Sequence, residues 1–222
     1  MSLRWKLLLP FLIILGAAAV QLAIMTHLTR IQETDTLRVN VAGRQRMLSQ
    51  KLSKEILLFL ADADPAHRAA AEATAATLEN NLRALARGGE ADLGQRKVTL
   101  PPTENRETVA ELQRAEQLWN AVKPAVQGIL AGQVPDRVAA GKAVSKQLDE
   151  VRVAFDGITA RYEQDSAQRA RQDLTLIYLC LVAYGVTIAV TVYLTERHII
   201  RPMRRLRDGA AAIARGDLTF EL

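Results

Sequence analysis

Two long stretches without a charged residue constrain this chain more than any other feature of its sequence. Residues 7–25 contain one amide, Gln21, among apolar and small side chains, and residues 174–194 also lack charges. Because a helix rises 1.5 Å per residue, each stretch is long enough to cross a hydrocarbon layer about 30 Å thick. We therefore predict two transmembrane helices. The alternative for the first stretch is a cleavable signal peptide that ends at the alanines of residues 17–19.

The charges that flank these stretches predict how the chain is oriented. Of 29 Lys and Arg residues, eight lie outside residues 26–173, as do four of the 24 Asp and Glu residues. The basic residues at the two ends are Arg4, Lys6, Arg197, Arg201, Arg204, Arg205, Arg207 and Arg215. The ends thus carry four of the five net positive charges, and the middle segment carries one. Because basic residues near membrane spans stay on the cytoplasmic side, we predict that both termini are cytoplasmic and that residues 26–173 lie on the external side of the membrane.

The same distribution argues against nucleic acid as a partner. The basic residues adjoin a predicted membrane surface, where they suit lipid headgroups, and aromatic residues, which would stack on bases, make up only 5% of the chain. One cysteine, Cys180 within the second apolar stretch, excludes a disulfide framework. His27, His67 and His198 are scattered, and no nucleophile–base pair or phosphate loop is evident. We expect no enzymatic activity, no metal and no cofactor.

The segment between the spans shows the periodicity of helices. Apolar residues recur every three or four positions in four runs, with no alternating pattern typical of strands. The runs are Leu37, Val41, Leu48, Leu52, Ile56 and Phe59; Leu78, Leu82 and Leu85; Leu112, Ala115, Trp119, Val122, Val126 and Ile129; and Val144, Leu148, Val151, Phe155, Ile158 and Tyr162. Breaks fall at Asp64-Pro65, between residues 88 and 102, and between residues 132 and 135.

These features predict an all-α fold, an antiparallel four-helix bundle whose first and last helices continue into the membrane. The third helix is expected to start at Pro101-Pro102-Thr103, with Glu104 and Glu107 in its first turn. Pro124 is expected to kink it.

One face of the first external helix carries small and polar residues beside the core stripe. Val39, Gly43, Arg46, Gln50 and Ser53 share this face. A helical glycine costs about 1 kcal/mol relative to alanine, which close approach of a second helix or an anion would offset. If two copies pack through this face, their Arg46 guanidinium groups meet and repel unless a planar oxyanion bridges them. The alternative is an ordinary solvated face that includes Arg44, Arg46 and Lys51.

The sequence NVAGRQRMLSQKLSKEIL at residues 40–57 resembles the signature helix of the PilJ-type periplasmic domain. That domain is the N-terminal sensor of type IV pili chemotaxis transducers and a relative of the nitrate/nitrite sensor domain of NarX-type kinases. Residues 100–122, including Trp119, resemble the family's third helix. The resemblance covers most of residues 30–165. It implies a dimeric helical domain on the periplasmic side of the bacterial inner membrane, which in some members binds nitrate between paired arginines.

The resemblance also implies site residues, through the pattern Ala-Gly-x-x-Arg-Met. It places the anion-contacting arginine on Arg46 and the helix-approach glycine on Gly43, with Ala42, Met47 and Gln50 completing the ligand-binding set. Asn40, Arg44, Ser49 and Lys51 support the motif. The family often has arginine at the position of Lys51, and a lysine keeps the charge without the bidentate geometry.

The C-terminal residues resemble the start of a HAMP domain. The matching features are Arg201-Pro202, Leu206, the stripe Ala210, Ile213 and Ala214, and Gly216-Asp217-Leu218. A generic basic amphipathic helix next to the membrane is the alternative. Because the chain stops after the first helix of such a module, we expect a fragment of a longer receptor whose cytoplasmic signalling module lies downstream.

The expected organisation is a cytoplasmic N-terminus (1–6), a first span (7–25), a sensor bundle (26–173), a second span (174–194) and a HAMP-like helix (195–222). Two functions fit it. The first is a receptor that binds a small oxyanion, nitrate or nitrite, at a homodimer interface and relays the signal across the membrane. The alternative is a protein-interaction sensor of the type IV pilus chemotaxis-transducer type, with no small-molecule ligand.

Overall fold

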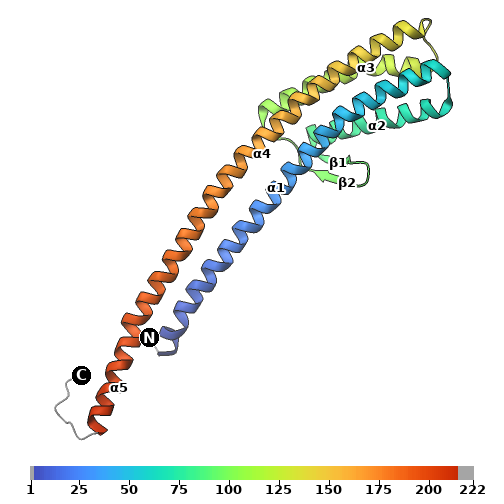
Figure 1. Cartoon of the computed structure of the whole chain (residues 1–222). Helices are drawn as coiled ribbons and strands as arrows, with labels where there is room; N and C mark the ends of the chain where they lie inside the picture. Colours follow the sequence, from blue (N-terminus) through green and yellow to red (C-terminus); the bar gives the residue numbers. More distant parts are fainter. Residues whose placement is uncertain (1–2, 215–222) are drawn as a thin grey trace. The chain divides into compact units, whose positions relative to one another are not determined.

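The structure is a computed structural model that describes residues 3–214 (Figure 1). Its helices are α1 (Leu3–Asp62), α2 (Pro65–Arg87), α3 (Arg106–Leu130), α4 (Arg137–Thr195), the π-helical turn η1 (Glu196–Ile200) and α5 (Arg201–Ala214). Two short strands, β1 (Gly89–Asp92) and β2 (Lys97–Leu100), separate α2 from α3. The chain divides into two compact units, Ile31–Ala170 and the pair of segments Met1–Arg30 and Arg171–Leu222.

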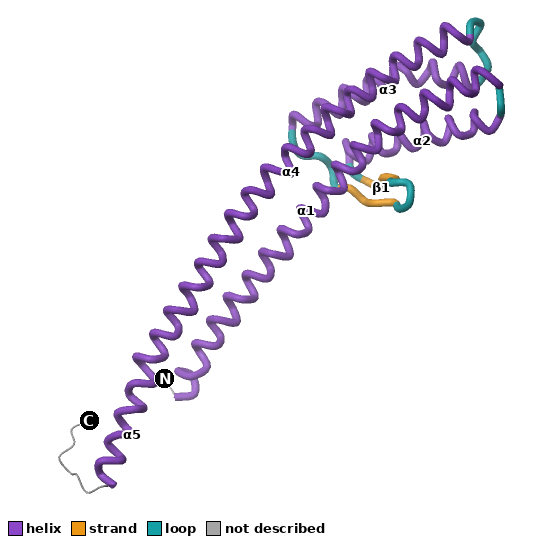
Figure 2. Tube along the Cα trace, in the orientation of Figure 1, coloured by secondary structure: helices purple, strands orange, loops and turns teal. Residues whose placement is uncertain are grey.

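The unit Ile31–Ala170 is the predicted antiparallel four-helix bundle, built from α2, α3 and the adjoining parts of α1 and α4 (Figure 2). The four apolar stripes form one core, in which Leu37 and Phe59 are partly buried and the other predicted members are buried. Trp119 and Phe155 are its largest fully enclosed side chains. The helical periodicity of the sequence therefore identified the core correctly.

The two turns at one end of the bundle follow the predicted breaks. The α1–α2 turn passes through Ala63 at a φ of 54°, and the Asp64 side chain accepts a hydrogen bond from the Ala66 backbone N–H at 2.7 Å, which caps α2. Between α3 and α4, Gly132 takes a φ of 72° and Asp136 accepts from the backbone of Val138. Pro124 lies inside α3, and the helix continues through it.

The connection between α2 and α3 differs from the sequence prediction in two ways. It contains the antiparallel hairpin β1–β2, in which Gly89 pairs with Leu100, whereas the sequence shows no alternating pattern typical of strands there. In addition, α3 begins at Arg106 with Asn105 as its N-cap, so Glu104 lies outside the first turn. The reason is tertiary: the Thr103 hydroxyl donates to the Leu85 carbonyl at 2.7 Å and bonds with the Tyr162 hydroxyl, which holds this segment extended against the core.

Asn81 fastens the hairpin to α2 from a fully buried position. Its side-chain amide donates to the Asp92 carbonyl at 2.8 Å, and its side-chain oxygen accepts from the Asp92 N–H at 2.7 Å. The neighbouring Asn80 is exposed and makes one bond, to the Glu90 carbonyl. Strands of four residues are too short to be stable alone, so this clamp and the buried side chains Ala91 and Leu100 hold the hairpin in place.

We expect Asn81→Ala to lower the free energy of unfolding by about 1–3 kcal/mol, because it leaves a partly buried donor and acceptor of Asp92 unpaired. Asn80→Ala is the matched control and should cost about 1 kcal/mol or less. Hydrogen exchange of the residue 89–100 amides, compared between the two variants, measures the effect directly. Equal loss of protection in both variants would contradict the clamp.

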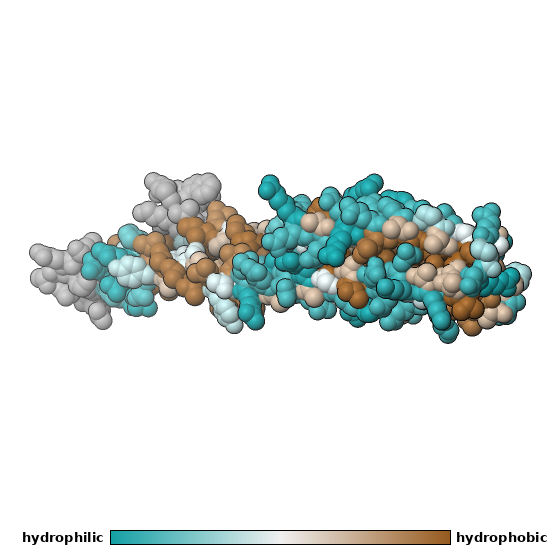
Figure 3. Space-filling view, turned by 90° about the horizontal axis from the view of Figure 1, so that it is seen from above, coloured by the Kyte–Doolittle hydropathy of each residue, from teal (hydrophilic) through white to brown (hydrophobic). Residues whose placement is uncertain are grey.

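The other unit contains the two predicted spans. The apolar parts of α1 and α4 are long and apolar enough to cross a membrane, and only 6% of the most apolar window in each helix is buried. Figure 3 shows apolar side chains gathered on the surface of this part of the molecule; the exposed ones include Phe11, Leu15, Leu179 and Val182. In water such a surface would be unfavourable, whereas lipid accommodates it, which agrees with two transmembrane helices.

After the second span, α4 gives way to the π-helical turn η1 and then to α5. The helix predicted to follow the second span is present as α5, which continues from η1 without a break and has Pro202 as its second residue. The side chains of Ile213 and Ala214, and the residues Gly216, Asp217 and Leu218 of the predicted HAMP pattern, lie outside what the structure describes.

Candidate functional site

The motif helix α1 presents part of the predicted site on its surface. Arg46, Met47 and Gln50 are exposed, and Gly43 is partly exposed. Among the described residues, nothing lies within 4 Å of an ideal Cβ built on Gly43. A side chain at this position would therefore fit within the single chain, and packing inside the bundle does not explain the glycine. One row of positions on α1, exposed apart from the partly exposed Gly43, follows alternating spacings of four and three residues, and other exposed residues such as Arg46 and Lys51 flank it. This row, which we call the α1 seam, consists of Gly43, Met47, Gln50, Lys54, Leu57 and Ala61.

Other members of the predicted set face elsewhere. Ala42 and Ser49 are buried at 0% and 1% exposure, and Ser49 lines a small cleft between α1 and α4. Ser49 donates to the Gln45 carbonyl within its own helix. The guanidinium group of Arg44 packs against Gly94 of the hairpin loop, where a Cβ would lie 2.6 Å from it.

Lys51 and Asn40 complete the supporting residues of the motif. The Lys51 ammonium group lies 3.5 Å from the Glu55 carboxylate, one turn further along α1. Lys51 is therefore engaged with its own helix rather than with the surroundings of Arg46. Asn40 is exposed, one turn before Arg44.

Arg46 pairs with a carboxylate from a different helix. Its Nη1 lies 3.3 Å from Oδ1 of Asp156 on α4, and the two side chains are 47% and 40% exposed. Exposed pairs of this kind are worth about 0–1 kcal/mol, because water screens them. Asp156 is far from the motif in sequence, so only the antiparallel packing of α1 against α4 brings the two together.

Asp156 has a second and closer partner on its own helix. Arg152 Nη1 donates to Asp156 Oδ2 at 2.7 Å, and Arg152 Nε donates to Asp149 Oδ1 at 2.7 Å. Hydrogen bonding to Asp149, with the attraction of both carboxylates, raises the pKa of Arg152 above its ordinary value. Arg46, Asp156, Arg152 and Asp149 thus form a row of alternating charges with no net charge. We call it the charge row.

A small cleft of about 160 Å³ lies beside the charge row. Its lining includes Gln50 and Ser53 from α1, and Ser145 and Arg152 from α4. The Ser53 hydroxyl donates to the Ser145 hydroxyl at 3.0 Å and so joins the two helices. Leu148 and the Asp149 carboxylate also line it, so the cleft offers hydroxyl, amide and guanidinium donors together with an acceptor that is paired with Arg152.

The charge row changes one expectation about Arg46. Two facing guanidinium groups were expected to repel each other without an anion, yet Asp156 already offsets the charge of each Arg46. Sequence reasoning missed Asp156, Arg152 and Asp149. Their spacings, i,i+3 and i,i+4, indicate ion pairs along α4, but nothing in the sequence connects them to Arg46.

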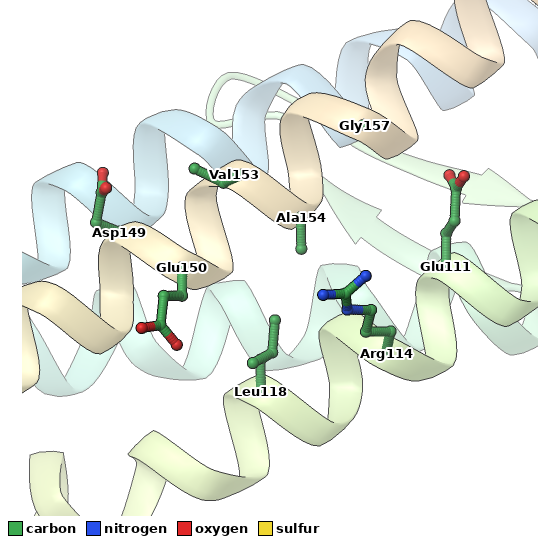
Figure 4. Close-up of a pocket in the computed structure, with 8 residues that line it drawn as sticks. All are labelled: Glu111, Arg114, Leu118, Asp149, Glu150, Val153, Ala154 and Gly157. Carbon is green, nitrogen blue, oxygen red and sulfur yellow. The ribbon is translucent and has the colours of Figure 1, made fainter.

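A second and larger cleft, of about 430 Å³, lies between α3 and α4. In Figure 4 the Arg114 side chain reaches from α3 toward α4, while the carboxylates of Glu111, Asp149 and Glu150 lie around the same opening. Two of these carboxylates are paired with arginines, Glu111 with Arg161 and Asp149 with Arg152. The α1 surface stays the candidate for the oxyanion expected from the sequence, because it carries the exposed Arg46 of the motif.

A third cluster, Asp62, Asp64 and His67, lies at the α1–α2 turn, where its potential ligand atoms are within 4.8 Å of one another. Both carboxylates already serve the turn. Asp62 accepts from the Asp64 N–H and Asp64 accepts from the Ala66 N–H. Since these side chains are exposed or half-buried, capping accounts for their arrangement.

Comparison with known proteins now identifies the family. Residues 27–145 match the family described as the N-terminal domain of type IV pili methyl-accepting chemotaxis transducers, PilJ, and this match covers more than half of the chain. The chain belongs to the PilJ family. The match includes the motif helix, α2, the hairpin, α3 and the start of α4, so Arg46 lies inside the PilJ domain and Asp156 beyond the matched residues.

The chain is also similar to a longer relative, the methyl-accepting chemotaxis protein McpN of Pseudomonas aeruginosa. The two are 26% identical over 225 residues, which cover 100% of this chain and 39% of the relative. The chain therefore spans about two fifths of the length of that relative. No solved structure gives a significant match.

Proposed function

We propose that this PilJ-family chain is the sensory part of a transmembrane receptor whose bundle binds a small oxyanion, nitrate or nitrite, through Arg46. The observation that carries the proposal is the exposed Arg46 guanidinium group beside Gly43, on a surface with open space. A planar oxyanion can accept two parallel N–H bonds from one guanidinium fork and two from another. Such a bridge needs two Arg46 side chains, and hence two copies of the chain.

The α1 seam supports packing of a second copy on this surface. Its spacing of four and three residues is that of a coiled-coil contact, and Met47 and Leu57, at 53% and 46% exposure, supply apolar side chains. Gly43 would let the two α1 backbones approach closely. In a dimer related by a two-fold axis, Arg46 at the edge of the seam lies close to its partner's counterpart.

The proposed signal leaves the bundle through its two long helices. Both α1 and α4 continue from the bundle into the apolar spans, so a change in their relative position reaches the cytoplasmic side. There α5 would act as the first helix of a HAMP-like relay, and the proposal assigns any catalytic output to other parts of the receptor. An anion can shift the receptor between two states only if it binds one of them more tightly.

We expect Arg46→Ala to weaken nitrate binding at least tenfold, because the guanidinium group is the only proposed direct ligand. The measurement is isothermal titration of the full chain in lipid nanodiscs, with chloride replaced by nitrate or nitrite at constant ionic strength. Arg68→Ala is the matched control, since Arg68 is an exposed helical arginine paired with Glu72 on its own helix. Absence of heat with both anions, or equal binding by the two variants, would refute the proposal.

A second candidate is a protein-interaction sensor that binds no small molecule. Its support is that Asp156 already neutralises Arg46, and that Met47 and Leu57 give the seam apolar contact area for a protein partner. Sedimentation of the chain with and without nitrate separates the two candidates. If nitrate shifts the chain from monomer toward dimer, the oxyanion receptor is favoured. If the monomer–dimer equilibrium is the same with and without nitrate, the interaction sensor is favoured.

A further inference from the structure

We propose that Asp156 is a built-in competitor for Arg46: it holds the guanidinium group in the ligand-free state, and an anion binds by taking its place. This inference rests on the proposed function and adds a residue from α4 to a site that the motif places on α1 alone. Anion binding then exchanges one negative partner of Arg46 for another, so Arg46 is paired with a negative group both before and after binding.

The geometry makes Asp156 a partner that can be displaced. Its contact with Arg46 is a single approach at 3.3 Å between half-exposed side chains, rather than the two parallel short bonds that a planar oxyanion can accept. Because both side chains are accessible to water, breaking the pair does not strand a charge in the protein interior. A bidentate anion can therefore displace Asp156 from Arg46.

Asp156 also keeps a partner when it loses Arg46. Its other oxygen accepts from Arg152 at 2.7 Å, and Arg152 is held in turn by Asp149 at 2.7 Å. The released carboxylate thus stays paired and in place on α4. A carboxylate without this support would lose its counter-ion on ligand binding, and the exchange would cost correspondingly more.

The exchange acts on a contact between the two helices that leave the bundle. Arg46–Asp156 joins α1 to α4, and other bonds join the same helices on either side of it. The Asp35 carboxylate accepts from Arg169 at 2.6 Å, and Ser53 bonds Ser145 at 3.0 Å. Displacing Asp156 therefore frees one tie between α1 and α4 while the others keep the helices in register. This couples the occupancy of Arg46 to the α1–α4 contact.

The test compares Asp156→Asn with Asp149→Asn in the full chain in lipid nanodiscs, titrated with sodium nitrate and sodium nitrite at constant ionic strength. Each substitution removes one carboxylate charge and one partner of Arg152, but only the first removes the partner of Arg46. We expect Asp156→Asn to bind the anion about two- to fivefold more tightly than wild type, and Asp149→Asn to bind like wild type. A merely structural role for Asp156 cannot tighten binding.

The possible outcomes distinguish failure of the competitor role of Asp156 from failure of the proposed anion binding by Arg46. Tightening by Asp156→Asn alone, relative to a wild type that binds the anion, supports the competitor. Equal tightening by both variants indicates a general charge effect and overturns it. Unchanged or weaker binding in Asp156→Asn, with wild type binding, also overturns the competitor but leaves the proposed function intact. If neither anion binds wild type or any variant, the proposed function fails and the competitor fails with it.

Discussion

Phe155→Ala is expected to lower the free energy of unfolding of the bundle by about 3–5 kcal/mol, the usual cost of deleting a fully buried phenyl ring. Phe155 lies on α4 at 0% exposure, within the single core that all four helices share. The neighbouring helices are fixed by their own core contacts, so they can close only part of the space left by the ring. For a domain of ordinary stability this is a large fraction of the total free energy of unfolding.

Val153→Ala is the matched control, two residues away on the same helix. Its side chain is 54% exposed, so the substitution should change stability by about 0.5 kcal/mol or less. Urea unfolding followed by Trp119 fluorescence in a Trp5→Phe background reports on the bundle, because Trp5 and Trp119 are the two tryptophans of the chain. Similar losses in the two variants would show that Phe155 is not a central core residue.

Gly88→Ala is expected to destabilise the bundle by about 2–4 kcal/mol, because two separate penalties combine at this position. Gly88 ends α2 with a φ of 77° and a ψ of 168°, a conformation that is nearly restricted to glycine. A Cβ there would lie 2.9 Å from the backbone nitrogen of Pro102 and 3.1 Å from the Leu100 carbonyl oxygen. These are backbone atoms, which cannot rotate away as the end of a side chain can.

Gly132→Ala separates the two penalties. Gly132 also has a positive φ, 72°, but nothing in the described part of the chain lies within 4 Å of its ideal Cβ. We therefore expect a loss of about 1 kcal/mol from conformation alone. The same urea titration compares the variants, and hydrogen exchange of the β1–β2 amides should rise in Gly88→Ala only. Equal destabilisation would show that the contact with residues 100–102 is not rigid.

The sequence predicted most of the fold because its signals are local. Uncharged stretches indicate spans wherever they occur, since a membrane requires every backbone group to be bonded within the helix. Stripes such as Val144 to Tyr162 identify a buried face from a repeat of three and four residues, with no knowledge of what packs against it. The α1–α2 turn was equally local, because Pro65 and the capping Asp64 are adjacent.

The hairpin and the start of α3 could not be predicted in the same way. The strands β1 and β2 are short and carry charged residues, so their sequence lacks a strand pattern. They are held by Asn81 from α2, and the extended segment after them by Thr103 against Leu85 and Tyr162. These contacts join residues that only the packing of the helices brings together.

At the candidate site, the helix, the small residue Gly43 and the cation Arg46 could be predicted from the sequence, because all three lie within a few residues of one another. The residues that lie next to Arg46 on the surface follow from the packing of the helices, which the sequence does not show. In the folded chain Ala42 and Ser49 are buried, Lys51 pairs with Glu55, and Asp156 of α4 pairs with Arg46. The physical reason is that a helix fixes spacing along its own axis, whereas the partner of an exposed charge is set by the register of the helix packed beside it.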